Sequence, residues 1–246
     1  GRNIQNDPFE CNNAQRNFLL CDYLLAPNKL TRNVYENDYM VRGIMHGQIK
    51  EQGYPRNSIF FDQNKRQSIK KRYGLEGKIS IFYMPTWRED KRNILEIIDF
   101  DRLNQLCIKN NNLFLFRLHP NTEINLDMLV SYSNLRIIDS SCDIYPILPF
   151  TDVLITDYSS IYYDYMLIPN KQILLFPFDE EEYCTFNRDL AFDYKIYTPG
   201  IRIYSFEALL EIVESKKNLN IKEIKVIKKL FWKGRNESII DRIINL

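Results

Sequence analysis

The chain has 246 residues, 45% of them hydrophobic, and its 33 Lys and Arg residues nearly balance its 32 Asp and Glu residues. A chain of this length buries about 70% of the surface that its unfolded state exposes, so a substantial core is expected. The net charge of +1 excludes a broad nucleic-acid-binding surface, and any anion site has to be local. No run of residues approaches the roughly 18 consecutive apolar positions of a membrane-spanning helix, and no signal peptide is recognisable.

The numbers and spacing of the cysteines and histidines bear on two features, disulfide bonds and metal sites. The five cysteines are scattered and form no CxxC pair, which is typical of reduced thiols in a cytosolic protein. With only two histidines, the sequence predicts no zinc site, and no cofactor is implied. His46 lies in a glycine-flanked loop and is interpreted as a residue without a functional role.

The first part of the chain alternates short apolar and helix-compatible segments. Asp22–Ala26 is a strand candidate, and Thr31 is a plausible N-cap for a helix that runs towards Tyr39. A second strand candidate ends at Gly53, and 58–73 is polar, basic and compatible with a helix.

The change of pattern near Gly74 predicts a domain boundary. Residues 1–73 are interpreted as the remnant of an N-terminal domain with a linker, and residues 74–246 as a C-terminal ligand-binding domain. The chain opens with Gly1 in place of a methionine, and we expect it to be a piece of a longer protein.

From residue 79 onward, strand-like runs alternate with helix-sized segments, which predicts a doubly wound α/β domain with a parallel sheet. The runs have three to six residues and are rich in branched and aromatic side chains, as in strands buried on both faces. The predicted strands are Ile79–Met84, Leu113–Leu118, Leu135–Ile138, Val153–Ile155 and Ile173–Phe176. The predicted helices are Phe100–Lys109 after Asp99, Ile144–Leu148 after Asp143, Ser160–Leu167 after Ser159, and, in the tail, Phe206–Ser215, Ile221–Phe231 and Glu237–Ile244.

Ligands of open α/β sheets bind beyond the carboxyl ends of the strands, so the residues that follow each strand are the candidates for a site. Thr86 and Arg88 follow the first of these strands and offer a hydroxyl and a forked guanidinium to a phosphate. An ordinary surface arginine beside a packed tryptophan is the alternative. Arg117 and His119 end the second strand, where an imidazole can bond a diphosphate oxygen or transfer a proton near neutral pH.

The segment after the fourth strand gives the most specific signal. Ser159 and Ser160 open the next helix, where free backbone N–H groups and hydroxyls favour a phosphate. Plain helix capping by Ser159 is the alternative. Asp164 lies four residues beyond Ser160 on the same helix face, so it either bonds a ligand hydroxyl such as a ribose or is solvated. A further arginine, Arg56, follows the strand candidate of the leading segment, so two halves of the chain meet over one ligand in this interpretation.

Taken in chain order, these segments resemble the motifs of the CDP-glycerol glycerophosphotransferase family, the wall teichoic acid and capsule polymerases. The similarity covers nearly the whole chain, and several ordered motifs are more specific than any one of them. The segments are Asn13–Phe18 with Asp22–Leu25, Gly53–Arg56, Pro85–Arg88, Arg117–Pro120, Thr156–Ser160 with Asp164, and Asp179–Tyr183.

The resemblance implies a GT-B architecture with the donor diphosphate between two Rossmann-like domains. It implies transfer of glycerol phosphate from CDP-glycerol to a polyol-phosphate or glycan acceptor, polymeric or lipid-linked, with release of CMP at the cytoplasmic face of a bacterial membrane. In the implied site, Ser159, Ser160, Arg88 and Arg56 hold phosphate oxygens, His119 is the catalytic residue that stabilises developing charge, Asp164 contacts the donor, and Thr86 and Arg117 complete the donor-binding set.

One family motif has no counterpart here. The family carries a second histidine, assigned as the general base, in a Trp-His-Gly-Thr-Pro type motif expected shortly before Asn13. We therefore expect this chain to bind the donor weakly and to transfer poorly or not at all. CDP-ribitol as donor, a UDP-sugar glycosyltransferase of the same fold and a non-catalytic nucleotide-binding module remain alternatives, and the motifs do not specify an oligomeric state.

Overall fold

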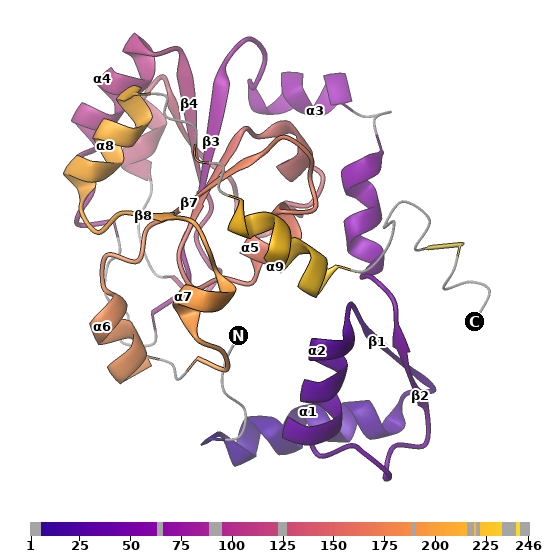
Figure 1. Cartoon of the computed structure of the whole chain (residues 1–246). Coiled ribbons are helices and arrows are strands. Elements are labelled where there is room, and N and C mark those ends of the chain that lie inside the picture. Colours follow the sequence, from indigo (N-terminus) through magenta and orange to yellow (C-terminus); the bar gives the residue numbers. More distant parts are fainter. Residues whose placement is uncertain are drawn as a thin grey trace.

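The computed structural model describes residues 6–62, 66–88, 95–122, 127–187, 190–215, 219, 222–232 and 240–241. They form a small lobe and a larger lobe built on a six-stranded sheet (Figure 1). Within these ranges, no helix combines the length and apolar character needed to cross a bilayer. All five cysteines are free thiols, as predicted.

The small lobe pairs two parallel strands and packs helices beside them. The start of its first helix is fixed by an N-cap: the Asp7 side chain accepts a hydrogen bond from the Glu10 N–H at 3.1 Å, and Pro8 follows as the first helical residue. The elements are α1 (Pro8–Leu20), β1 (Tyr23–Ala26), α2 (Lys29–Asn33), the π-helix η2 (Val34–Asp38) and β2 (Gln48–Glu51).

The predicted strand at residues 22–26 is confirmed as β1, but the predicted cap of the next helix is wrong. Asn28 caps α2, since its side chain accepts a hydrogen bond from the Thr31 N–H at 2.8 Å. Thr31 lies inside the helix, which continues as η2 almost to Tyr39. Both Asn and Thr are good caps, so composition alone did not choose between them.

The larger lobe is one parallel sheet in the order β5-β4-β3-β6-β7-β8. All five strands predicted after residue 78 are present within two residues of their predicted ends, and the doubly wound α/β class is confirmed. Only the two-residue edge strand β8 was not predicted. The strands are β3 (Ile79–Met84), β4 (Asn112–Phe116), β5 (Leu135–Ile137), β6 (Val153–Thr156), β7 (Gln172–Leu175) and β8 (Ile201–Arg202).

Alternate side chains of the central strands enter two separate cores, as the period of a strand requires. Leu113 and Leu115 pack on one face with Phe82, whereas Phe114 and Phe116 pack on the other. Every residue of β4 is buried, which explains why residues 113–116 are an unbroken apolar run after Asn112.

The order of the strands fixes where a ligand can bind. The chain proceeds from β3 outward to β4 and β5, then returns to β6 on the other side of β3 and continues outward to β7. The carboxyl ends of β3 and β6 therefore lie side by side at the point where the winding reverses. Ligands of such sheets bind at this reversal.

Helices cover both faces of the sheet (Figure 1). On one face lie α4 (Phe100–Lys109) and α8 (Phe206–Ser215), both at their predicted positions, and Asp99 caps α4 through the Arg102 N–H at 3.0 Å. On the other face lie α5 (Ile161–Tyr165) and α9 (Glu223–Phe231).

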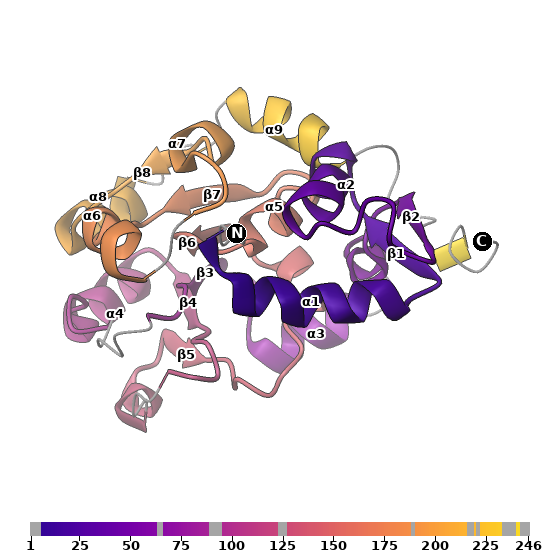
Figure 2. The ribbon, with the colours of Figure 1, turned by 90° about the horizontal axis from the view of Figure 1, so that it is seen from below.

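Helix α9 also reaches the small lobe. The buried Asn28 side chain donates to the Phe231 carbonyl at 2.7 Å, and the rings of Tyr54 and Trp232 meet edge to face. The view from below shows α9 beside α2 (Figure 2). The predicted final helix at 237–244 falls mainly outside the described residues.

Two of the predicted helices do not form as continuous α-helices in the structure. No α-helix forms at 144–148, because Pro146 and Pro149 lack the N–H groups that a helix needs, and only a 3₁₀ turn, η5 (Leu148–Phe150), is present. Asp143 instead accepts from the Tyr145 N–H at 3.0 Å, as in an Asx turn. The helix predicted over 58–73 is divided into the 3₁₀ helix η3 (Pro55–Phe61) and α3 (Arg66–Tyr73).

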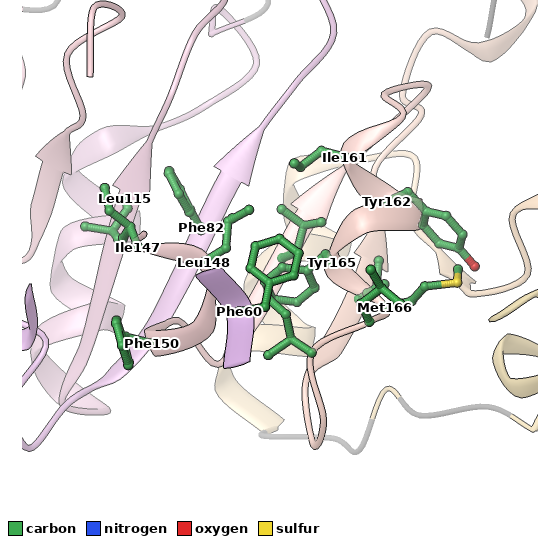
Figure 3. Close-up of a cluster of buried hydrophobic side chains, with 14 of the residues drawn as sticks. Phe60, Phe82, Leu115, Ile147, Leu148, Phe150, Ile161, Tyr162, Tyr165 and Met166 are labelled. Atoms are coloured by element: carbon green, nitrogen blue, oxygen red, sulfur yellow. The ribbon is translucent and has the colours of Figure 1, made fainter. Parts of the chain in front are cut away.

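The segment before residue 74 contributes to the core of the larger lobe. Phe60 of η3 is 2% exposed and packs among Leu148, Tyr165 and other buried side chains (Figure 3). The division between residues 73 and 74 stays a prediction. The short elements that complete the fold are η4 (Asp127–Ser131), α6 (Glu180–Glu182), the π-helix η6 (Tyr183–Asn187) and α7 (Tyr194–Tyr197).

Candidate functional site

A cleft of about 330 Å³ opens at the carboxyl ends of β3, β4 and β6, where the winding reverses. Its volume is at the lower end of the range usual for small-ligand sites, roughly 300–1,000 Å³. Five of the eight predicted site residues line it, and they come from three different loops. They are Thr86, Arg117, His119, Ser159 and Ser160.

His119 stands at the exposed rim of the cleft, directly after β4. Its Nδ1 accepts a hydrogen bond from the Asn121 N–H at 3.2 Å, so the proton of the neutral ring belongs on Nε2. The imidazole stacks on Trp87 with 6.0 Å between ring centroids and 29° between planes. This arrangement orients one N–H donor of a ring that can also accept a proton.

Arg117 lies half-buried in the wall of the cleft. Its Nη2 donates to the carbonyl oxygens of Ser140 and Cys142, so it anchors the loop that follows β5. Burial lowers the pKa of Arg117 below its ordinary value, but an arginine stays protonated at neutral pH. A positive charge is therefore held in place at the cleft.

Ser159 and Ser160 bring two hydroxyls to the start of α5. Ser160 occupies the N-cap position without a side-chain cap bond, whereas the Ser159 hydroxyl accepts from the Ile161 N–H at a long 3.4 Å. The predicted strong cap at Ser159 is therefore wrong, and α5 is shorter than predicted, covering Ile161–Tyr165. The first N–H groups of α5 donate to Ser159 and Ser160 themselves, so the two hydroxyls are the groups that this segment offers to an anion.

Arg88 is not in the cleft wall. It is 1% exposed, and its guanidinium donates to both oxygens of Asp179 at 2.7 and 2.9 Å, to Asp157 at 2.9 Å and to the Thr86 carbonyl at 2.6 Å. Burial by itself lowers the pKa of Arg88, but the two aspartates outweigh burial and raise it above its ordinary value. This geometry contradicts the predicted direct contact of Arg88 with a phosphate, because the side chain is enclosed by protein partners.

Arg56 and Asp164 form a second cluster that does not line the cleft. The Asp164 carboxylate is 3% exposed and accepts from Arg56 at 3.0 Å, from Asn57 at 3.1 Å and from the Tyr145 hydroxyl at 2.7 Å. The Arg56 guanidinium lies 4.2 Å from the ring centroid of Tyr54. Arg56 of the leading segment and Asp164 of the larger lobe do meet, as predicted for the two halves of the chain. However, the Asp164 carboxylate binds Arg56 and its neighbours in place of a ligand.

Sequence reasoning missed the aromatic part of the cleft and the carboxylates below it. Tyr158 and Tyr183 both line the cleft and stack with 3.8 Å between centroids and 12° between planes. Asp157 and Asp179 lie in segments that were noted for their sequence, but no role was assigned to them. Their signal was their position, since each follows the carboxyl end of a buried strand.

The side chains in the walls of the cleft are of kinds that bind an anion. Within the part of the chain that the structure describes, no group of three His, Cys, Asp or Glu residues is arranged to hold a metal ion. The chemistry offered by the walls is one guanidinium, one imidazole, several hydroxyls and aromatic rings.

Comparison with known proteins identifies the group to which the chain belongs. Residues 1–246 match the family of CDP-Glycerol:Poly(glycerophosphate) glycerophosphotransferases. The teichoic acid ribitol-phosphate polymerase TarL of Staphylococcus aureus is 30% identical over 71% of the chain. A teichoic acid poly(glycerol phosphate) polymerase of Bacillus spizizenii is 28% identical over 83% of the chain.

The fold comparison agrees. A structure of a variant of the wall teichoic acid polymerase TagF with CDPG is 25% identical, covers 95% of the chain and gives a TM-score of 0.76. The chain spans only 32% of TarL, 54% of the Bacillus spizizenii polymerase and 60% of the TagF chain. The chain has the GT-B type of α/β fold and belongs to the CDP-glycerol:poly(glycerophosphate) glycerophosphotransferase family.

Proposed function

We propose that the cleft binds the cytidine diphosphate part of a CDP-polyol donor, and that the whole protein, as distinct from this chain alone, transfers the polyol phosphate to an acceptor and releases CMP. The observation that carries this proposal is the convergence of Arg117, His119 and the Ser159–Ser160 hydroxyls on one cleft at the reversal of the sheet. Family membership supports the same reaction class.

The reaction needs charge to be stabilised at the diphosphate. A hydroxyl oxygen of the acceptor's terminal polyol forms a bond to the β-phosphorus of the donor and releases its proton to water. The bond from that phosphorus to the bridging oxygen breaks, and the electron pair leaves with CMP. Negative charge then grows on the departing phosphate. Arg117 and the donors at the start of α5 stabilise that charge, and the Nε2–H group of His119 donates a hydrogen bond to it.

CDP-glycerol is the proposed donor, and CDP-ribitol is the second candidate because polymerases of both polyol phosphates are among the relatives. The acceptor is a polyol-phosphate polymer or a lipid-linked glycan of teichoic acid or capsule synthesis. We place the reaction in the cytoplasm, at the membrane face where a lipid-linked acceptor is available.

Calorimetric titration of the chain tests this proposal. CMP and CDP-glycerol are expected to bind one per chain, with UMP weaker, and CDP-glycerol is expected to bind more tightly than CDP-ribitol. Equal or reversed affinity for the two CDP-polyols would refute the glycerol assignment. Binding of UMP as tight as that of CMP would instead favour a UDP-sugar transferase.

A further inference from the structure

Asp157 lies directly below the cleft, at the end of β6, and is 1% exposed. One of its oxygens, Oδ1, accepts three hydrogen bonds: from the Thr86 N–H at 2.8 Å, the Thr86 hydroxyl at 2.5 Å and the Tyr158 N–H at 2.6 Å. Both donor residues line the cleft. A single carboxylate oxygen thus fixes the loop after β3 against the loop after β6.

The other oxygen of Asp157 is bound by Arg88, which extends the connection to a third loop. Arg88 also donates two hydrogen bonds to the carboxylate of Asp179, which follows β7. The Tyr158 hydroxyl donates to the same carboxylate at 3.1 Å. The Arg88 guanidinium lies 4.7 Å from the ring centroid of Tyr183, the partner of Tyr158 in the stacked pair. Three loops of the cleft are therefore joined through one buried network.

The charge of this network is not what an anion site requires. Among the side chains that the structure describes in this network, two carboxylates accompany one guanidinium below a cleft proposed to hold a diphosphate, and like charges repel. Stability does not account for the network either, because well-packed apolar residues of similar size are often as stable as a buried ion network. Its remaining consequence is geometric.

We infer that Asp157 is a positioning residue for the donor site, which acts through Thr86 and the Tyr158–Ser160 loop and is itself held by Arg88 and Asp179. This inference rests on the proposed function, since it assigns a role within the same cleft. The carboxylate sets the separation between the Thr86 hydroxyl on one wall and the serine hydroxyls on the other. Donors held at fixed positions bind an anion without reorganising on contact.

The matched control lies at the other end of the same two strands. Asp152 accepts from the Ser80 N–H at 2.8 Å and the Ser80 hydroxyl at 3.0 Å, so it ties the amino ends of β3 and β6 as Asp157 ties their carboxyl ends. Asp152→Asn therefore perturbs the same pair of strands away from the cleft.

The experiment measures CMP affinity by calorimetry and folding by circular dichroism for the unaltered chain, Asp157→Asn and Asp152→Asn. Asp157→Asn is expected to weaken CMP binding by about tenfold or more while the chain stays folded. Asp152→Asn is expected to leave CMP affinity unchanged. Equal affinity of the unaltered chain and folded Asp157→Asn would overturn the inference, as would an equal loss in Asp152→Asn.

A double-mutant cycle separates positioning from a general structural effect. If Asp157 acts through Thr86, the loss of CMP affinity in Asp157→Asn combined with Thr86→Val is smaller than the sum of the two single losses. Additive losses would overturn the inference. Should Asp157→Asn not fold, Asp179→Asn tests the same network, with a loss of CMP affinity expected and unchanged affinity counting against it. Absence of CMP binding in the unaltered chain would refute the proposed function itself, which is a different result.

Discussion

Replacing Arg88 with methionine tests the buried network most severely. The substitution keeps most of the side-chain volume but removes four hydrogen bonds and takes the Arg88 guanidinium away from the buried carboxylates of Asp157 and Asp179. Removal of one partner from a buried ion pair costs about 3–5 kcal/mol. A domain has only about 5–15 kcal/mol of stability in total, so Arg88→Met is expected to unfold much more easily.

Urea denaturation followed by circular dichroism measures this loss, and the midpoint is expected to fall by roughly 1 M or more. Arg102→Met is the control, because Arg102 pairs with Glu207 at 3.2 Å with both side chains more than half exposed, and such pairs contribute little. A variant that combines Arg88→Met with Asp157→Asn and Asp179→Asn is expected to regain part of the stability, since the orphaned charges are gone. If Arg88→Met costs no more than Arg102→Met, the reasoning about the buried charges is wrong.

Three further predictions concern the cleft and the residues around it. His119→Ala and Ser159→Ala each weaken CMP binding in a calorimetric titration, and unchanged affinity in both would refute the site assignment. Asp164→Asn lowers the thermal midpoint, because the side chain at position 164 loses its ion pair with Arg56, but it leaves CMP affinity unchanged. A loss of CMP affinity without a loss of stability would show that Asp164 contacts the ligand, as predicted from the sequence. Burial raises the pKa of Cys107 from 9.0 to about 12, so the folded state keeps the thiol proton longer than the unfolded state does. The free energy of unfolding that this pKa difference contributes is fully present below pH 9 and is lost as the pH rises towards 12. Urea midpoints at pH 8 and pH 10.5 measure that loss, and the loss should be smaller in Cys107→Ala. An equal loss in Cys107→Ala would assign the pH dependence to other groups.

The strands of the large sheet were predictable because the sheet is buried on both faces. Residues 113–116 are apolar throughout, as a strand buried on both faces requires. The helix at 144–148 could not be predicted correctly from its cap alone. Asp143 is as suited to an Asx turn as to a helix, and the two prolines of the segment decide for the turn.

The position of the cleft could be predicted from the sequence, but the side chains that pair with one another around it could not. Residues after buried parallel strands share one edge of the sheet, so Thr86, His119 and Ser159 were expected together, and they line one cleft. Arg88 met the same criterion, yet Asp179 lies 91 residues away in sequence and encloses it. Which donors face the ligand and which face one another depends on long-range pairing, and a local pattern does not contain that information.

The central claim is that this cleft holds the cytidine diphosphate of the donor. Calorimetric titration of the 246-residue chain with CMP and with UMP tests it most directly. We expect saturable binding of one CMP per chain that is weakened by His119→Ala, with UMP binding more weakly. No detectable CMP binding, or CMP binding that His119→Ala and Ser159→Ala leave unchanged, would contradict it.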